Sequence, residues 1–399
     1  MGSVVSIKFC KAKKLSEQGD ALEQFVLGLM YMGYSGVEDV GENHQEGIKW
    51  LKRSAEQENI EAKVSLGFHL AIGKVVERDI NKALPLLLEG ARDGHWFAQL
   101  IAGSIYLGLF GGKTDYQEAL KWLTESARQG NMMAQFLIGE LYFNGEGVNK
   151  NYEKAAKWLK KAVEQGYARA GAYLGQLYLK GRGVTKDSSE ALRLFRNSAE
   201  KNDKLAQYCL AVMYWQGTEV KKNYQKAAYW YRRSAEQGYA EAQFELAMMY
   251  IRGEGVEEDC CEAVKWFKAA AEQGNVVAQY KAGLMYYYGY GVNKDYASAV
   301  KLLKQAAENG HMDAQFELGR MYLLGRGVNN DVSEAVKLLR KSAEQEFAEA
   351  QCLLGVVYVC GLGVESDYVE AMNWFKKATA QGDKKAHECI ERLQKLMND

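Results

Sequence analysis

The sequence predicts an all-α solenoid of about ten helix–turn–helix repeats, each 36 residues long, with a capping helix at either end. Three observations lead to this prediction. The chain repeats itself with a fixed period, apolar residues within each period have helical spacing, and small residues recur in two columns. A fixed period over most of the 399 residues replaces the two or three separate domains that the length alone would favour.

The period is set by a glycine-like position that closes segments such as AEQGY, AEQGN and AENGH. We call it the boundary position; it is occupied by Glu58, Gly94, Gly130, Gly166, Asn202, Gly238, Gly274, Gly310, Glu346 and Gly382. These residues are 36 apart without a gap, and one earlier unit of 39 residues carries a three-residue insertion within 33–45. We therefore expect an N-terminal capping helix in residues 1–18, ten repeats in residues 19–382 and a C-terminal capping helix in residues 383–399.

The unit after Gly130 illustrates the two helices of a repeat. Apolar residues from Ala134 to Tyr142 are spaced as one helix face, and Gly145 can end that helix in a left-handed conformation. Asn151 stands where an N-cap would begin the second helix. In an earlier unit, Pro85 lies about five residues inside a second helix, where we expect it to kink or delay that helix.

Two columns of small residues predict close packing. The first helix carries Gly28, Gly67, Gly103, Gly139, Gly175, Ala211, Ala247, Gly283, Gly319 and Gly355. The second helix carries Ala83, Ala119, Ala155, Ala191, Ala227, Ala263, Ala299, Ala335 and Ala371. A glycine within a helix costs about 1 kcal/mol relative to alanine. We therefore expect a second backbone to pass close to the first column, with the alanine column as its partner.

The repeated pattern A-x-A-Q-x-x-L-G-x-x-Y-x-x-G-x-G-V-x-x-D-Y-x-x-A-x-x-W resembles the Sel-1-like repeat, a relative of the tetratricopeptide repeat. The unit from Ala278-Gln279 through Gly289-Tyr-Gly-Val292 to Asp295-Tyr296 and Ala299 matches it closely, and the resemblance covers about residues 19–382. It implies a right-handed superhelix of paired helices and a role in protein–protein interaction, without catalysis by the repeats.

By analogy with the tetratricopeptide repeat, the third, sixth, tenth, thirteenth and fourteenth positions after each boundary should face a concave groove. The predicted protein-binding residues are Phe136, Phe143, Tyr208, Trp215, Phe244, Met248, Ile251, Tyr280, Tyr287, Phe316, Arg320 and Leu323. An apolar and aromatic strip of this kind suits a peptide held by aromatic anchors. The alternative is that the sixth and thirteenth columns belong to the core between repeats.

Several other functions are disfavoured. Lys plus Arg and Asp plus Glu are 51 each, which argues against general nucleic-acid binding. The Gly-x-Gly-Val loops lack a following Lys-Ser/Thr, so we interpret them as turns rather than phosphate sites. We expect no catalytic residue, metal site or cofactor. The five histidines, which we expect at the surface or at helix starts, are His44, His69, His95, His311 and His387. The seven cysteines, which we expect to be small buried thiols without disulfides, are Cys10, Cys209, Cys260, Cys261, Cys352, Cys360 and Cys389.

The N-terminal residues Met1-Gly2-Ser3 to Ser6 fit a myristoylation pattern on Gly2, with Cys10 and nearby lysines as a second anchoring signal. The same segment also reads as an ordinary capping helix. No secretory signal or membrane-spanning stretch is visible, and the cysteines follow no repeating spacing, so we expect a cytoplasmic protein.

The sequence therefore predicts a non-enzymatic scaffold or adaptor that binds a protein or peptide in its groove. One alternative is a regulatory subunit that inhibits or activates a specific enzyme or sensor. A further alternative is a binder of small molecules or cell-wall fragments, which would require a deep pocket with convergent polar groups.

Overall fold

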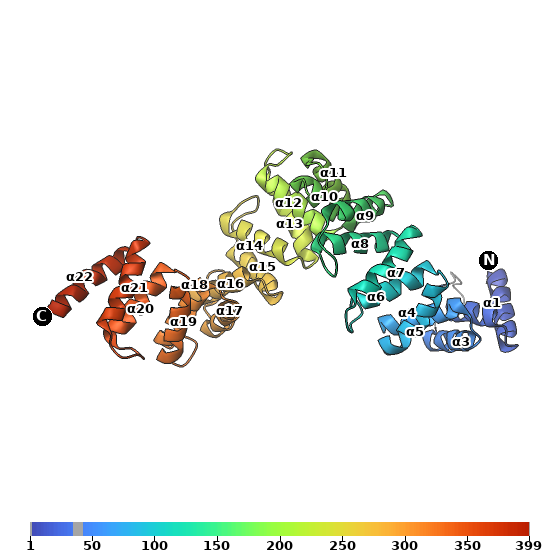
Figure 1. The fold of residues 1–399 in the computed structure, drawn as a ribbon, viewed down its shortest axis with the longest axis horizontal. Coiled ribbons are helices and arrows are strands. Elements are labelled where there is room, and N and C mark those ends of the chain that lie inside the picture. Colours follow the sequence, from blue (N-terminus) through green and yellow to red (C-terminus); the bar gives the residue numbers. More distant parts are fainter. Residues whose placement is uncertain (1, 35–42, 399) are drawn as a thin grey trace. The chain divides into compact units, whose positions relative to one another are not determined.

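The computed structural model describes residues 2–34 and 43–398. These residues form 22 α-helices and no strand, which confirms the all-α prediction (Figure 1). They pack as two compact units, one ending at Lys201 and one beginning at Asn202. Part of the predicted insertion, residues 35–42, lies outside the described residues.

Both units are built from short helices of similar length. The first unit contains α1 (Gly2–Glu17), α2 (Ala21–Tyr31), α3 (His44–Glu56), α4 (Ile60–Ile72), α5 (Ile80–Arg92), α6 (Trp96–Tyr106), α7 (Tyr116–Arg128), α8 (Met132–Asn144), α9 (Tyr152–Glu164), α10 (Ala168–Lys180) and α11 (Ser188–Glu200). The second unit contains α12 (Lys204–Gln216), α13 (Tyr224–Glu236), α14 (Ala240–Arg252), α15 (Cys260–Glu272), α16 (Val276–Tyr288), α17 (Tyr296–Glu308), α18 (Met312–Leu324), α19 (Val332–Glu344), α20 (Ala348–Cys360), α21 (Tyr368–Ala380) and α22 (Lys384–Asn398).

Within each unit, every even-numbered helix from α2 to α20 packs against the odd-numbered helix that follows it. We call these the first and second helix of a repeat. Each second helix also packs against the next first helix of its unit, so the pairs stack in chain order (Figure 1). The apolar core of each unit runs between the stacked pairs.

The boundary position has the same backbone conformation in every repeat. From Glu58 to Gly382 all ten copies have φ between 63° and 92°, the left-handed region. Glycine adopts this region without steric cost, which explains its recurrence. Glu58, Asn202 and Glu346 adopt the same conformation although they carry a side chain.

The two small-residue columns lie at the contact between the helices of a repeat. Every residue of the alanine column from Ala83 to Ala371 has an exposed fraction of 0%. The partner of the glycine column differs from the prediction, because the nearest atoms in most repeats belong to a leucine or phenylalanine one turn after the alanine. A Cβ added at Gly139 would lie 2.8 Å from Leu159 and 3.4 Å from the carbonyl of Ala155. The glycine therefore makes room chiefly for a large side chain, and secondarily for the facing backbone.

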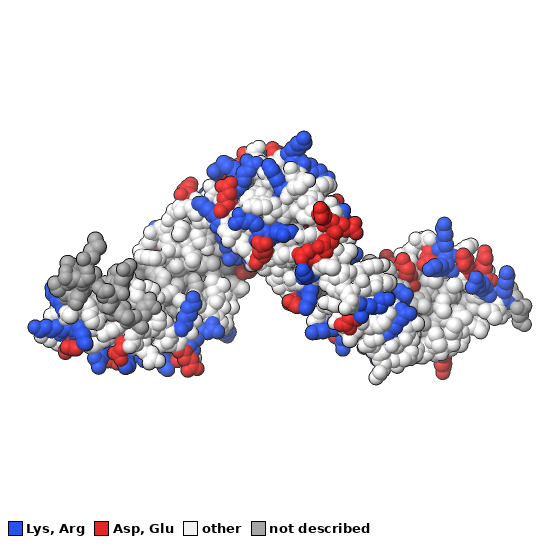
Figure 2. Space-filling view, turned by 180° about the vertical axis from the view of Figure 1, so that it is seen from behind, with Lys and Arg blue, Asp and Glu red and all other residues white. Residues whose placement is uncertain are grey.

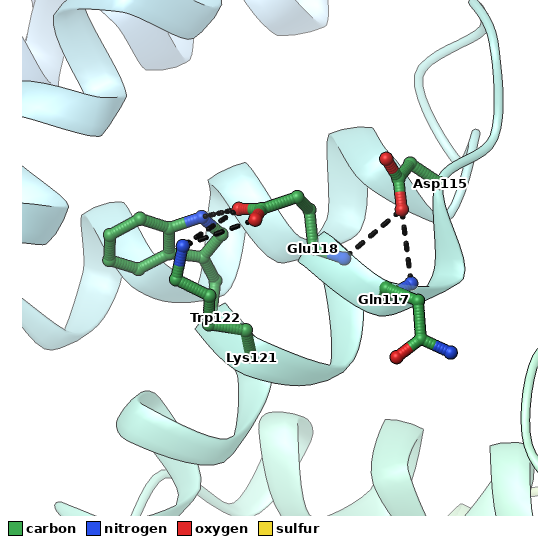
Figure 3. Close-up of polar contacts among 5 residues, drawn as sticks. All are labelled: Asp115, Gln117, Glu118, Lys121 and Trp122. Atoms are coloured by element: carbon green, nitrogen blue, oxygen red, sulfur yellow. Dashed lines mark hydrogen bonds and ion pairs between the residues drawn. The ribbon is translucent and has the colours of Figure 1, made fainter.

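The helix ends follow the predicted capping chemistry. Asn151 accepts a hydrogen bond from the backbone N–H of Lys154 at 2.9 Å, and Gly145 ends α8 with φ of 79°. Asp115 caps α7 in the same way as Asn151 caps α9 (Figure 3). The expected delay at Pro85 is wrong: α5 begins at Ile80, one period before Tyr116 begins α7. Pro85 is exposed, so water can reach the Asn81 carbonyl that loses its helical partner.

Buried glutamines tie neighbouring helices together. In the bridge between Gln99 and Gln129, the Gln99 Nε2 donates to the carbonyl of Ala91 in α5, and its Oε1 accepts from Gln129 Nε2 at 2.8 Å. One side chain in α6 thereby connects the end of α5 to the end of α7. The same donor and acceptor pair recurs as Gln57–Gln24, Gln165–Gln135, Gln237–Gln207, Gln273–Gln243, Gln345–Gln315 and Gln381–Gln351.

Candidate interaction surface

Within its unit, each first helix packs against its own second helix and against any helix that directly precedes it, and it keeps one face that these helices leave uncovered. On α12, α14, α16 and α18 of the second unit, the residues at the third, seventh, tenth and fourteenth positions after the boundary are all exposed or half-buried. The spacing of four, three and four residues places them on one side of each helix. We call this face the first-helix stripe; it comprises Leu205, Cys209, Val212 and Gln216 on α12, Glu241, Glu245, Met248 and Arg252 on α14, Val277, Lys281, Leu284 and Tyr288 on α16, and Asp313, Glu317, Arg320 and Leu324 on α18.

Some neighbouring first helices contact each other directly, as α4 and α6 do in the first unit. In the second unit the same exposed positions recur on successive first helices, so the stripe repeats from one helix pair to the next. This is the arrangement that a peptide or a partner helix would need in order to cross several repeats.

Charged side chains alternate along the seventh position of the stripe. Glu245, Lys281 and Glu317 occupy this position on α14, α16 and α18. Burial raises the pKa of the Glu245 carboxyl, and the positive charge of Arg252 opposes that rise. Burial also raises the pKa of Glu317, although Arg320 lies 3.0 Å away and favours its charged form. Within the described residues, Glu245 has no hydrogen bond or ion pair, so its charge is available to a partner.

Aromatic side chains lie at the end of the stripe on α16. Tyr288 and Tyr290 are 44% and 58% exposed, and their rings stack at 5.5 Å. Tyr287 packs against both Tyr288 and Tyr296 from inside. Leu324, one period after Tyr288, is 53% exposed. Exposed aromatic and apolar groups supported by buried rings are typical anchors of protein interfaces.

The twelve residues predicted from the sequence are divided by the structure. Met248 and Arg320 lie on the stripe. Phe136 and Tyr287 are only 2% and 6% exposed, so these two belong to the core, as the alternative allowed, and cannot serve as direct contacts. The other eight are half-buried, and their role in binding stays a prediction. Phe143 lies on α8 of the first unit, and the other seven flank the stripe residues on their own helices: Tyr208, Trp215, Phe244, Ile251, Tyr280, Phe316 and Leu323.

The rings of the sixth column pack between repeats. Phe316 contacts Phe347, which precedes the next first helix, with ring centroids 5.3 Å apart. Tyr280 stacks in the same way on His311 at 4.6 Å. Each ring thus has one side in the inter-repeat interface and only its other side near the stripe.

The prediction missed the seventh position, which holds the half-buried charges. The borrowed tetratricopeptide register shares its third, tenth and fourteenth positions with the stripe, but it included the sixth and thirteenth positions and left out the seventh. The alternation of Glu245, Lys281 and Glu317 was visible in the sequence, because charged residues recur there inside otherwise apolar helices. On the face shown in Figure 2, Lys and Arg are interspersed with Asp and Glu.

The Gly-x-Gly loops act as turns. Their first glycine ends the first helix, and their second approaches the start of an earlier second helix. A Cβ at Gly255 would lie 2.2 Å from the carbonyl carbon of Tyr224, and one at Gly291 would lie 2.2 Å from the carbonyl oxygen of Cys260. The second glycine is therefore required by a close approach between repeats.

Histidine and cysteine placements are mixed. His95 and His311 are the N-caps of α6 and α18, as expected for helix-start histidines. The expectation is wrong for His69, which lies in the last turn of α4 and is 4% exposed. None of the seven cysteines forms a disulfide, but only Cys352 is buried, so the expectation of buried thiols is wrong for the others. Among the described residues, no three His, Cys, Asp or Glu side chains are grouped as metal ligands.

Comparison with known proteins identifies the repeats. The Sel1 repeat family matches ten segments, namely residues 24–59, 60–95, 96–131, 133–167, 168–203, 204–239, 240–275, 276–311, 313–347 and 348–383. The chain belongs to the Sel1 repeat family. Repeats of this kind generally mediate protein–protein interactions, and the family is typically non-catalytic.

Two solved Sel1 repeat structures are similar to this chain. One is a protective antigen present in uropathogenic Escherichia coli strains, displaying an SLR fold, with 32% identity, a TM-score of 0.52 and coverage of 97% of this chain and 90% of the other. The other is a Sel1 repeat protein from Oxalobacter formigenes, with 32% identity, a TM-score of 0.51 and coverage of 78% and 90%. A search of curated proteins gave no match. No helix formed by the described residues is long and apolar enough to cross a membrane.

Proposed function

We propose that this Sel1 repeat protein is a non-enzymatic scaffold or adaptor that binds a protein or peptide along the first-helix stripe. The observation that carries the proposal is the composition of the stripe in the second unit. It combines exposed aromatic and apolar side chains with half-buried charges at fixed repeat positions. The exposed apolar groups supply surface that a bound partner can bury, and the charges fix the orientation of that partner.

The chemistry of the stripe defines the partner that would fit. Tyr288 and Leu324 offer anchor points for apolar side chains of the partner. Glu245 and Glu317 call for basic groups, and Lys281, which lies between them in repeat order, calls for an acidic one. A partner segment with basic, acidic and basic groups along one side would complement this column. Such pairing sets register and excludes other partners more than it adds affinity.

The test compares two surface variants of the intact chain. A stripe variant carries Tyr288→Ser and Leu324→Ser, and a control variant carries Tyr229→Ser and Val369→Ser on second helices α13 and α21. The four side chains are between 44% and 66% exposed, so both variants should fold. Partners are captured from the native host, identified by mass spectrometry and then purified for titration calorimetry.

We expect the parent chain and the control variant to bind the same purified partner with equal affinity. The stripe variant should bind it at least about tenfold more weakly, because two anchors are lost. Equal binding by the stripe variant would exclude this surface. An enzyme or sensor whose activity changes on binding would identify the protein as a regulatory subunit.

Two further expectations stay proposals. Acylation of Gly2 rests on the sequence pattern, and α1 begins at that residue. Residence in the cytoplasm is supported by the seven cysteines, none of which forms a disulfide, as a reducing compartment would preserve them.

A further inference from the structure

One buried glutamine lacks the partner that its counterparts have. Gln279 is 5% exposed, and its Nε2 donates to the carbonyl of Ala271 at 3.2 Å, as in other repeats. Its Oε1 is buried with no hydrogen bond. In the repeats on either side, Gln243 and Gln315 accept at this atom from a glutamine 30 residues later.

The missing donor has a simple cause. The residue 30 positions after Gln279 is Asn309, whose side chain is one methylene group shorter than glutamine. Its Nδ2 donates to the carbonyl of Gln305 within its own helix, at 2.9 Å. The amide that would close the bridge is therefore absent from this repeat.

A cavity lies at the unclosed bridge. It has a volume of about 400 Å³ and is lined by Lys268, Gln279, Tyr286, Lys301, Leu302 and Gln305 among others. The volume lies within the range of small-ligand pockets. None of the lining residues belongs to the first-helix stripe, so this site is independent of the proposed function.

We infer that this cavity binds a primary carboxamide, the group at the end of a glutamine side chain, supplied from outside the chain. The Gln279 oxygen requires an N–H donor, and the equivalent oxygen in seven other repeats receives that donor from a glutamine amide. The carbonyl of the incoming amide can accept from Lys268 or Lys301, whose ammonium groups are donors only. A buried acceptor left unpaired gains more from a donor than an exposed one does.

The binding test uses three compounds and the full chain. N-acetylglutamine N-methylamide represents a glutamine within a protein, and L-glutamine represents the free amino acid. N-acetylglutamate N-methylamide has nearly the same shape, but its side chain ends in a charged carboxylate that has no N–H donor. Binding is followed by NMR through the side-chain amide signal of Gln279. For a ligand of this size we expect saturation with a Kd on the order of 1 mM.

We expect the blocked glutamine to shift the Gln279 signal and the blocked glutamate to bind at least about tenfold more weakly. Binding of the blocked compound alone assigns the site to a partner protein, and binding of L-glutamine as well assigns it to the free amino acid. Equal binding of the glutamate analogue, or no saturable shift with either glutamine compound, would overturn the inference.

Asn309→Gln is the matched blocking variant. It should close the bridge internally, abolish binding and raise the urea midpoint of the chain, so loss of binding could not be ascribed to unfolding. Asn309→Ala keeps the space open and should still bind. Binding to Asn309→Gln that equals binding to the parent would also overturn the inference.

Discussion

The side-chain amide of Gln273 donates to Oε1 of Gln243 at 2.7 Å, across 30 residues of chain. Gln243 in turn donates to the carbonyl of Ala235 at 3.0 Å, so the pair connects α13, α14 and α15. Because Gln243 is only 6% exposed, water has little access to its side-chain amide, and these two hydrogen bonds satisfy its buried polar atoms. The bridge explains why both glutamines recur in the repeat.

Gln273→Ala should destabilise the protein by about 1–3 kcal/mol, because it leaves the buried Gln243 oxygen unpaired. The free energy of unfolding from urea titration, followed by circular dichroism, measures this loss. Asn309→Ala is the matched control, since the residue at this position one repeat later makes no bridge. Its effect should be clearly smaller, and equal losses would show that the bridge contributes nothing beyond local helix capping.

Gly255→Ala should destabilise the protein more than Gly253→Ala. Both glycines have positive φ, 72° and 64°, so each alanine carries the left-handed cost of about 1–2 kcal/mol. A Cβ at Gly255 would also lie 2.2 Å from the backbone of Tyr224, whereas one at Gly253 meets nothing closer than 3.8 Å. The close contact should add about 1–3 kcal/mol in urea denaturation. Equal effects of the two substitutions would mean that the loop shifts freely away from Tyr224.

Glu346→Gly should stabilise the protein by up to about 1 kcal/mol. Glu346 holds the left-handed boundary conformation with φ of 66°, which most other repeats assign to glycine. Removing its Cβ relieves that cost, and the greater freedom of glycine in the unfolded chain offsets part of the gain. Gly310→Glu, one repeat earlier, is the reverse change and should lower the urea midpoint. A decrease with Glu346→Gly would contradict this account of the boundary.

Glu245→Gln should stabilise the protein at neutral pH and not at acidic pH. Burial raises the native pKa of Glu245 above its unfolded value. Between those two values the native state binds more protons than the unfolded state, so the free energy of unfolding falls as pH rises. The glutamine variant lacks this loss. The free energy of unfolding of Glu245→Gln should therefore exceed that of the parent once pH rises through the raised pKa. The two values should be equal below the ordinary pKa range of a carboxyl group.

The control for that prediction is Glu241→Gln, on the same helix. Glu241 is exposed, so its charge is solvated in both states, and the variant should follow the parent across the pH range. Urea titrations between pH 4 and pH 7 distinguish the two substitutions. A parallel gain in both would show that net charge, rather than burial of Glu245, sets the effect.

Much of the fold could be predicted from the sequence, because the same local residue requirements recur in every repeat. The boundary glycines, the Asn151 cap and the alanine column each reflect a backbone or size requirement that holds at one position whatever lies elsewhere. Recurrence every 36 residues then separates such requirements from chance. The candidate surface was harder to predict from the sequence, because the burial of Phe136 or Tyr287 depends on how its helix is rotated about its axis. Sequence spacing does not fix that rotation to better than a residue.

The sequence by itself determined that this protein is a chain of paired helices with a period of 36 residues, which residues separate the repeats, and which family it belongs to. Periodic turn and cap residues act locally, so they are visible without coordinates. Only the tertiary structure decided which side of each first helix is exposed, and which groups meet across 30 residues of chain. Those outcomes depend on how side chains from separate helices fill one space. The side chain of Asn309 is one methylene shorter than glutamine, and this difference matters only because the Gln279 oxygen stands opposite without a donor.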